Sequence, residues 1–167
     1  MPQESACVAR PLCRDCTTLR LADFLPYRIS VAAESVSRAF ADRYEAEFGL
    51  SIPEWRVMAI LGEAPPLPTR TVIERTEMDR VKVSRAVIRL VDRGLVLRQP
   101  QPEDLRAHVL RLSPQGKELY ERIVPRACGL QAELAQALTA EELAALDRIL
   151  TKLHRRARQL LAPEAGA

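Results

Sequence analysis

One short segment of the chain carries polar and basic side chains of the types that bind nucleic acid. Arginine can donate two parallel hydrogen bonds to guanine, while serine and lysine can bind base edges or phosphates. The outermost of these residues recur three or four positions apart, a spacing that lines them up on one face of a helix. A solvated helix face could have the same composition. The candidate DNA-binding residues of this segment are Arg80, Lys82, Ser84, Arg85 and Arg89.

A second candidate pair, Asp104 and Arg106, lies in a short charged stretch between two apolar segments. An arginine at the tip of a narrow β-loop can enter the minor groove of DNA, where the negative potential is strongest. The carboxylate two residues earlier could hold the guanidinium in place. An ordinary surface ion pair would show the same spacing and would contribute little to stability.

The positive charge of the chain is concentrated around these candidates. The formal net charge is only +3, yet residues 70–111 hold ten basic and six acidic side chains, so the rest of the chain is slightly negative. This distribution is typical of a module that reads DNA, and a merely solvated surface could also produce it.

Composition and length exclude several other classes of protein. With 167 residues, 47% of them hydrophobic, the chain can bury one sizeable core without disulfides or a metal. No apolar run has membrane-spanning length, and the N-terminus lacks the layout of a signal peptide, so we expect a cytoplasmic protein with no membrane partner. We find no phosphate-binding glycine loop, nucleophile elbow or metalloprotease helix, and therefore expect neither an enzyme nor a cofactor.

Helix-capping residues, prolines and glycines predict the helices and strands that position the candidate DNA-binding residues. Ser51 opens a helix, the proline-rich run 64–68 is a stiff connector, and a short helix begins at Thr69 or Arg70. Asp79 caps a helix over 80–93 that ends at Gly94. Two strands, 95–98 and 107–112, then form a hairpin. The basic helix buries Val83, Val87, Leu90 and Val91.

The flanking segments predict long helices. Residues 19–48 are helical with an interruption at Pro26, and Ser113 and Pro114 start another long helix, in which Pro125 predicts a kink. The last helix begins at Thr139 and repeats leucine at alternating spacings of three and four, a seam that needs a partner helix. Packing within one chain is the alternative to a homodimer. The apolar stripe of the first helix comprises Ile29, Ala33, Val36, Phe40 and Tyr44.

These patterns predict a mainly helical fold with a small β-wing, a winged helix-turn-helix. We expect a tail over 1–18, a dimerisation and ligand helix over 19–50, and a DNA-binding lobe over 51–112. Helices for dimerisation follow over 113–162, and a tail over 163–167.

Several motifs resemble those of a known family. They are Gly49 to Val57, Val83-Ser84-Arg85, Leu90 to Val96, and Asp104-Leu105-Arg106 followed by Leu112 to Gly116. Together these motifs resemble the multiple-antibiotic-resistance regulator (MarR) family over about residues 20–160. Leu105 departs from the family pattern, which usually has a basic residue at this position. Family members also often have threonine at the position that Ser113 occupies here. The acid–arginine pair is retained, so the resemblance still implies DNA binding.

The resemblance implies a triangular homodimer in which the first and last helices of two subunits interlock and two winged lobes read a palindromic operator. Recognition helices would then lie about 34 Å apart, one turn of DNA. Members of the family are commonly repressors released by a small ligand. Binding of that ligand would change the spacing of the lobes and so weaken the hold on one half-site.

Two stretches, 25–30 and 120–127, resemble members that control the breakdown of aromatic acids. The implied effector is a small aromatic carboxylate or an aryl-coenzyme A thioester. The candidate pocket combines apolar walls with cations, although Trp55 could be plain core and the arginines plain surface. The candidate ligand-binding residues are Tyr27, Arg28, Arg38, Trp55 and Arg56.

Two alternatives remain open at this point. Cys7, Cys13, Cys16 and Cys128 would allow sensing by oxidation, although no cysteine lies between residues 17 and 127. The spacing of the three tail cysteines has a metal-ligand character, but a fourth ligand is missing nearby, so no metal site is expected. The basic helix could also contact an acidic protein instead of DNA, which would make the chain a protein-interaction dimer.

Overall fold

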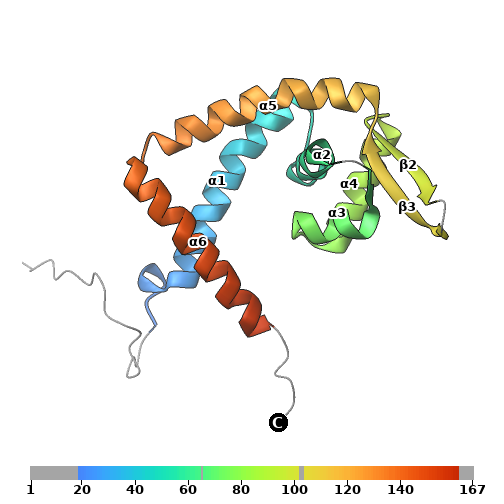
Figure 1. The fold of residues 1–167 in the computed structure, drawn as a ribbon. Helices are drawn as coiled ribbons and strands as arrows, with labels where there is room; N and C mark the ends of the chain where they lie inside the picture. Colours follow the sequence, from blue (N-terminus) through green and yellow to red (C-terminus); the bar gives the residue numbers. More distant parts are fainter. Residues whose placement is uncertain (1–18, 65, 102–103, 162–167) are drawn as a thin grey trace, which may run out of the picture.

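The computed structural model describes residues 19–64, 66–101 and 104–161. Three long helices, α1 (Leu25–Phe48), α5 (Pro114–Ala135) and α6 (Ala140–Leu161), make an open frame, and a smaller lobe of helices and strands hangs from the N-terminal end of α5 (Figure 1). A short 3-10 turn, η1 (Leu21–Asp23), precedes α1. Ion pairs of Arg43 with Glu133 and of Arg126 with Glu47 join α1 to α5.

Helix α1 begins at Leu25, and the predicted interruption falls at Phe24, between η1 and α1, instead of at Pro26. Pro26 lies in the first turn of α1, where its missing N–H has no intrahelical partner to lose. Gly49 ends the helix with φ +61°; its N–H donates to the Glu45 carbonyl at 2.9 Å, and the Leu50 N–H donates to the Tyr44 carbonyl at 3.4 Å. The predicted stripe is buried only at its C-terminal end: Tyr44 is 3% exposed, whereas Ile29 and Val36 are each 38% exposed.

The lobe contains three helices whose starts the sequence predicted. They are α2 (Ile52–Glu63), α3 (Thr69–Thr76) and α4 (Arg80–Asp92). Ser51 and Glu54 form a capping box at the start of α2, and the Asp79 carboxylate accepts from the backbone N–H groups at the start of α4. Glu77 turns the chain between α3 and α4 with φ +51°.

The core lies where α2 and α4 pack together and meet the sheet and α5. Val83, Val87 and Leu90 are buried as predicted, while Val91 is only partly buried. Trp55 is half-buried at the edge of the core. Fully buried side chains are Leu50, Val57, Met58, Val72, Val83, Leu90, Val96, Leu110 and Ile123.

The sheet has three antiparallel strands, one more than the expected hairpin. Strands β2 (Val96–Gln101) and β3 (Asp104–Leu112) form the hairpin, and β1 (Leu67–Pro68) pairs with the other edge of β3. The connector expected to be only a stiff loop supplies β1, because Leu67 pairs opposite Leu110 at the core edge. A proline is tolerated there because β1 is an edge strand.

The hairpin is fixed to α5 through Ser113 and Gly116. The Ser113 hydroxyl donates to the Gly94 carbonyl at 2.6 Å and accepts from the Gly116 N–H at 2.9 Å. A Cβ at Gly116 would overlap the Leu95 carbonyl, so this close approach of backbones requires glycine. Helix α5 spans Pro125 as one element.

Helix α6 begins where predicted, with the Glu142 carboxylate accepting from Thr139 N–H and the Thr139 hydroxyl accepting from Glu142 N–H. Its leucine seam is exposed in the single chain: Leu146 is 41% and Leu150 50% exposed. Across the described residues, no helix combines the length and apolarity that crossing a membrane requires.

Candidate nucleic-acid interface

The predicted DNA-contacting row lies on the outer surface of α4. Arg80, Lys82 and Arg85 are exposed and Ser84 is half-buried. Val83, Ala86, Val87 and Leu90 on the opposite side anchor the helix in the core. The exposed cations therefore lie on a helix whose other face is anchored in the core.

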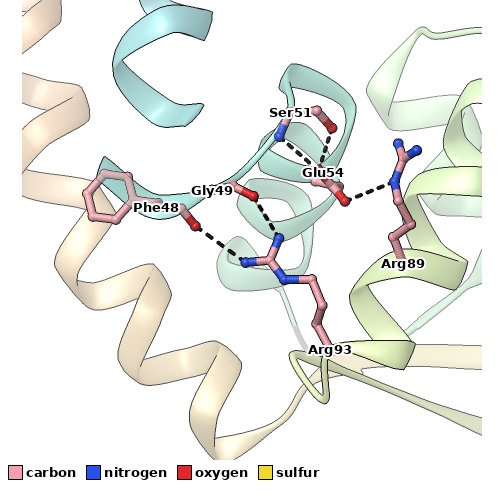
Figure 2. A network of polar contacts seen from close by, with 6 residues as sticks. All are labelled: Phe48, Gly49, Ser51, Glu54, Arg89 and Arg93. Atoms are coloured by element: carbon pink, nitrogen blue, oxygen red, sulfur yellow. Dashed lines mark hydrogen bonds and ion pairs between the residues drawn. The ribbon is translucent and has the colours of Figure 1, made fainter. Parts of the chain in front are cut away.

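Arg89, the fifth residue of the predicted row, has a partner inside the protein. Its Nε donates to the Glu54 carboxylate of α2 at 3.0 Å, although about half of the Arg89 side chain stays exposed (Figure 2). The Nη groups of the guanidinium remain available as donors. Arg89 thus connects α2 with the basic face of α4.

Glu54 is a buried acid, 5% exposed, and its carboxylate accepts hydrogen bonds from Ser51 and Arg89 that stabilise the negative charge. Ser51 donates to one carboxylate oxygen through its N–H (2.8 Å) and hydroxyl (2.5 Å), and Arg89 donates to the other. Burial raises the pKa of Glu54, but the Ser51 hydrogen bonds and the Arg89 charge outweigh burial and hold the pKa below its ordinary value.

A second arginine joins the C-terminal end of α4 to the end of α1. Arg93 donates to the Gly49 carbonyl at 2.8 Å and to the Phe48 carbonyl at 3.3 Å (Figure 2). These carbonyls belong to the end of a helix, where backbone acceptors lack intrahelical donors. The recognition helix is therefore connected directly to the end of the first long helix. No pattern in the sequence predicts this contact, since 44 residues separate Arg93 from Gly49.

The second pair of candidate residues belongs to the hairpin of β2 and β3. The backbones of Asp104 and Arg106 belong to β3, but their side chains lie outside the described residues, so their predicted pairing stays a prediction. Nearer the base of the hairpin, Arg98 on β2 and His108 on β3 lie 3.3 Å apart through Nη2 and Nδ1.

A single chain does not gather the five candidate ligand-binding residues. Trp55 packs against Tyr44 with ring centroids 5.0 Å apart, whereas Tyr27 lies 17 residues before Tyr44 on the same helix. At 1.5 Å per residue that separation is about 25 Å. Arg38 pairs with Glu34 and lines a hollow along α1, and Arg28 and Arg56 are exposed.

A hollow of about 590 Å³ between α2, β3 and the start of α5 was not predicted. Leu61, Leu112 and Tyr120 contribute apolar surface, and Arg111 and Lys117 bring positive charge to its rim. Gly62 and Tyr120 both line this hollow, and the Tyr120 ring lies so close to Gly62 that a Cβ there would overlap it.

The described residues contain no cluster of histidine, cysteine and acidic side chains suited to a metal ion. Cys128 is exposed and has no disulfide partner in the part of the chain that the structure describes. Cys7, Cys13 and Cys16, on which the oxidation and metal hypotheses mainly depended, lie outside the described part of the chain.

This arrangement of capped helices and a three-stranded sheet defines a winged helix-turn-helix module carried on a long-helix frame, as predicted. A model of the MarR family matches residues 48–107. The chain is 27% identical over 119 residues to the homoprotocatechuate degradative operon repressor of Escherichia coli, covering 71% of this chain and 78% of the repressor.

Two solved structures are similar to the whole module. The PcaV regulator of Streptomyces coelicolor in complex with its natural ligand is 25% identical, with a TM-score of 0.72 over 85% of this chain and 99% of that chain. A MarR variant of E. coli in complex with operator DNA is also 25% identical, with a TM-score of 0.71 over 77% and 92% of the two chains.

Over these residues and in its fold, the chain is similar to transcription regulators of the MarR family. The relatives named here are transcription regulators, which agrees with the regulator predicted from the sequence.

Proposed function

We propose that this protein is a ligand-responsive repressor that binds a palindromic operator as a homodimer, with α4 in the major groove and the wing in the adjacent minor groove. The observation that carries the proposal is the exposed cationic face of α4 on a helix buried on its other side. The solved MarR variant bound to operator DNA supports it, because its fold matches this chain.

Within the interface, each residue has a distinct role. Arg85, in the middle of the exposed face, donates to a guanine edge, and Arg80 and Lys82 contact phosphates. Ser84 contacts a base or phosphate at the margin. Arg89 donates to phosphate while Glu54 holds its Nε. In the wing, Asp104 orients Arg106 toward the minor groove.

The homodimer forms through α1 and α6. Apolar side chains on these helices stay exposed in the single chain, among them Leu146 and Leu150 of α6 and Val31 of α1. Burying them requires a second helix surface, and a second copy of the chain supplies one with the same leucine spacing.

The effector is a small aromatic carboxylate or an aryl-coenzyme A thioester. The relation to a homoprotocatechuate operon repressor and to a regulator solved with its natural ligand supports this class. Since Tyr27 and Trp55 lie far apart within one chain, a pocket that uses both takes them from different subunits. Arg28, Arg38 and Arg56 supply cations for the carboxylate or phosphates.

Fluorescence polarisation with DNA from the protein's own upstream region tests the proposal. We expect nanomolar, sequence-dependent binding with a steep salt slope. Arg85→Ala and Arg106→Ala weaken binding while leaving the dimer intact, and Arg122→Ala, an exposed arginine on α5, serves as the matched control.

A panel of aromatic acids and their coenzyme A thioesters then identifies the signal by release of the DNA. Binding no tighter than to random DNA would contradict the proposal and favour the protein-interaction alternative. Release by peroxide alone would favour sensing through the cysteines.

A further inference from the structure

We propose that Val81 and Ile88 of α4 read the methyl groups of two thymines in each operator half-site. This inference rests on the proposed function, since it assumes that α4 lies in the major groove. It adds two apolar specificity residues to an interface that charge and hydrogen-bonding chemistry alone had defined.

The two side chains lie where α4 faces farthest from the core. At 100° per residue, Val81, Arg85 and Ile88 fall within a narrow sector opposite buried Val83 and Leu90. Val81 is 53% and Ile88 54% exposed. A helix that inserts this face into a groove therefore brings the two apolar side chains to the groove floor together with Arg85.

An isolated exposed apolar residue needs no explanation. Here, however, two β-branched residues lie one turn on either side of an arginine, and β-branched residues are weaker helix formers than the polar residues usual on a solvated face. Their surroundings are cationic, with Arg80 and Lys82 on the same helix. That charge attracts a polyanion and disfavours an uncharged apolar partner.

Thymine supplies an apolar partner for these two side chains. In the major groove the base edges display hydrogen-bonding groups, and the C5 methyl of thymine is the apolar exception. Val81 and Ile88 are seven residues apart, about 10 Å along the helix axis. Because base pairs are spaced about 3.4 Å apart, the two methyl groups lie about three base steps apart, with the guanine bound by Arg85 between them.

The test begins with a duplex enriched by the protein from a random pool. Each thymine is replaced in turn by deoxyuridine, which removes only the methyl group. We expect binding to weaken about three- to fivefold at two positions in each half-site, since one buried methyl group is lost there. Thymines elsewhere in the same duplex are the matched control and should tolerate the replacement.

Variant proteins assign each methyl group to its reader. Val81→Ser and Ile88→Ser remove every methyl group of the side chain and leave a hydroxyl on Cβ. Each variant should bind the thymine duplex more weakly and lose discrimination between thymine and deoxyuridine at one position. The salt slope should stay unchanged, because an apolar contact releases no counterions.

The outcomes separate the inference from the proposed function. Specific, salt-dependent binding with no deoxyuridine-sensitive position overturns the inference and leaves the function standing. Sensitivity that persists in both serine variants also overturns it, because another group then contacts the thymine methyl groups. If no duplex is enriched from the pool, the proposed function fails and the inference fails with it.

Discussion

At the scale of single residues, the most informative side chain is Glu54. Its carboxylate lies in the first turn of α2, where a negative charge is favourable, and it is also a buried acceptor shared by Ser51 of its own capping box and Arg89 of the basic helix. Glu54 therefore caps its own helix and also holds the side chain of Arg89, a predicted DNA-contacting arginine.

Glu54→Gln should reduce the free energy of unfolding by about 1–3 kcal/mol, because it removes charge-assisted hydrogen bonds from a buried site. Urea denaturation measures the change. Glu74→Gln, which removes the exposed i,i+4 partner of Arg70, is the control and should cost less than about 0.5 kcal/mol. Equal stability of the Glu54 variant and the parent would contradict the assigned role.

The same carboxyl group predicts a dependence on pH. Because the pKa of Glu54 is lower in the folded than in the unfolded protein, its contribution is fully present above the unfolded value, about 4.3, and is lost as pH falls through the folded value. The stability difference between the parent and Glu54→Gln should therefore shrink below about pH 4. Denaturation curves across pH 3–7 check this, and a constant difference would exclude the linkage.

At the scale of elements, the junctions between helices and strands depend on glycine and on long side chains. Arg93 joins α4 to the end of α1, and Gly116 lets α5 approach the backbone of Leu95. These two contacts hold α4 and the hairpin to the long helices, so we expect a displacement of α1 or α5 to move both elements that we propose contact DNA.

Two glycines of α5 make a matched test of this packing. Gly116→Ala should destabilise the protein by about 1–3 kcal/mol or more, since the added methyl group overlaps the Leu95 carbonyl. Gly129→Ala, with no atom within 4 Å of the added Cβ, should be stabilising by about 0.5–1 kcal/mol through helix propensity. Thermal unfolding of both variants compares them, and effects of the same sign would contradict the close approach.

At the scale of the whole molecule, the frame of α1, α5 and α6 leaves apolar surface that a single chain does not cover. A substitution at the α6 seam should therefore act on assembly, whereas one on the opposite face of the same helix should not.

The double variant Leu146→Glu, Leu150→Glu should convert the dimer to a monomer and abolish tight operator binding, because it places four charges in the apolar interface of each dimer. Light scattering after size exclusion measures the mass. Arg148→Glu, on the other side of α6, is the control and should remain dimeric. A dimeric double variant would mean that α6 is not the interface.

The sequence by itself determined the order and the ends of most elements, together with the basic helix. Ser51, Asp79, Ser113 and Thr139 start helices, and Gly49 ends one, through contacts within a few residues. Capping of this kind is local, so spacing along the chain is enough to reveal it.

Only the tertiary structure decided which distant groups meet. The pairing of Arg89 with Glu54, the contact of Arg93 with α1, the strand at Leu67–Pro68 and the separation of Tyr27 from Trp55 all depend on how elements pack. Periodicity specifies which face of a helix is buried, but not which residue of another element lies against it. Which residues meet depends on how the side chains of the two elements pack together, and the number of residues between the elements does not predict this packing.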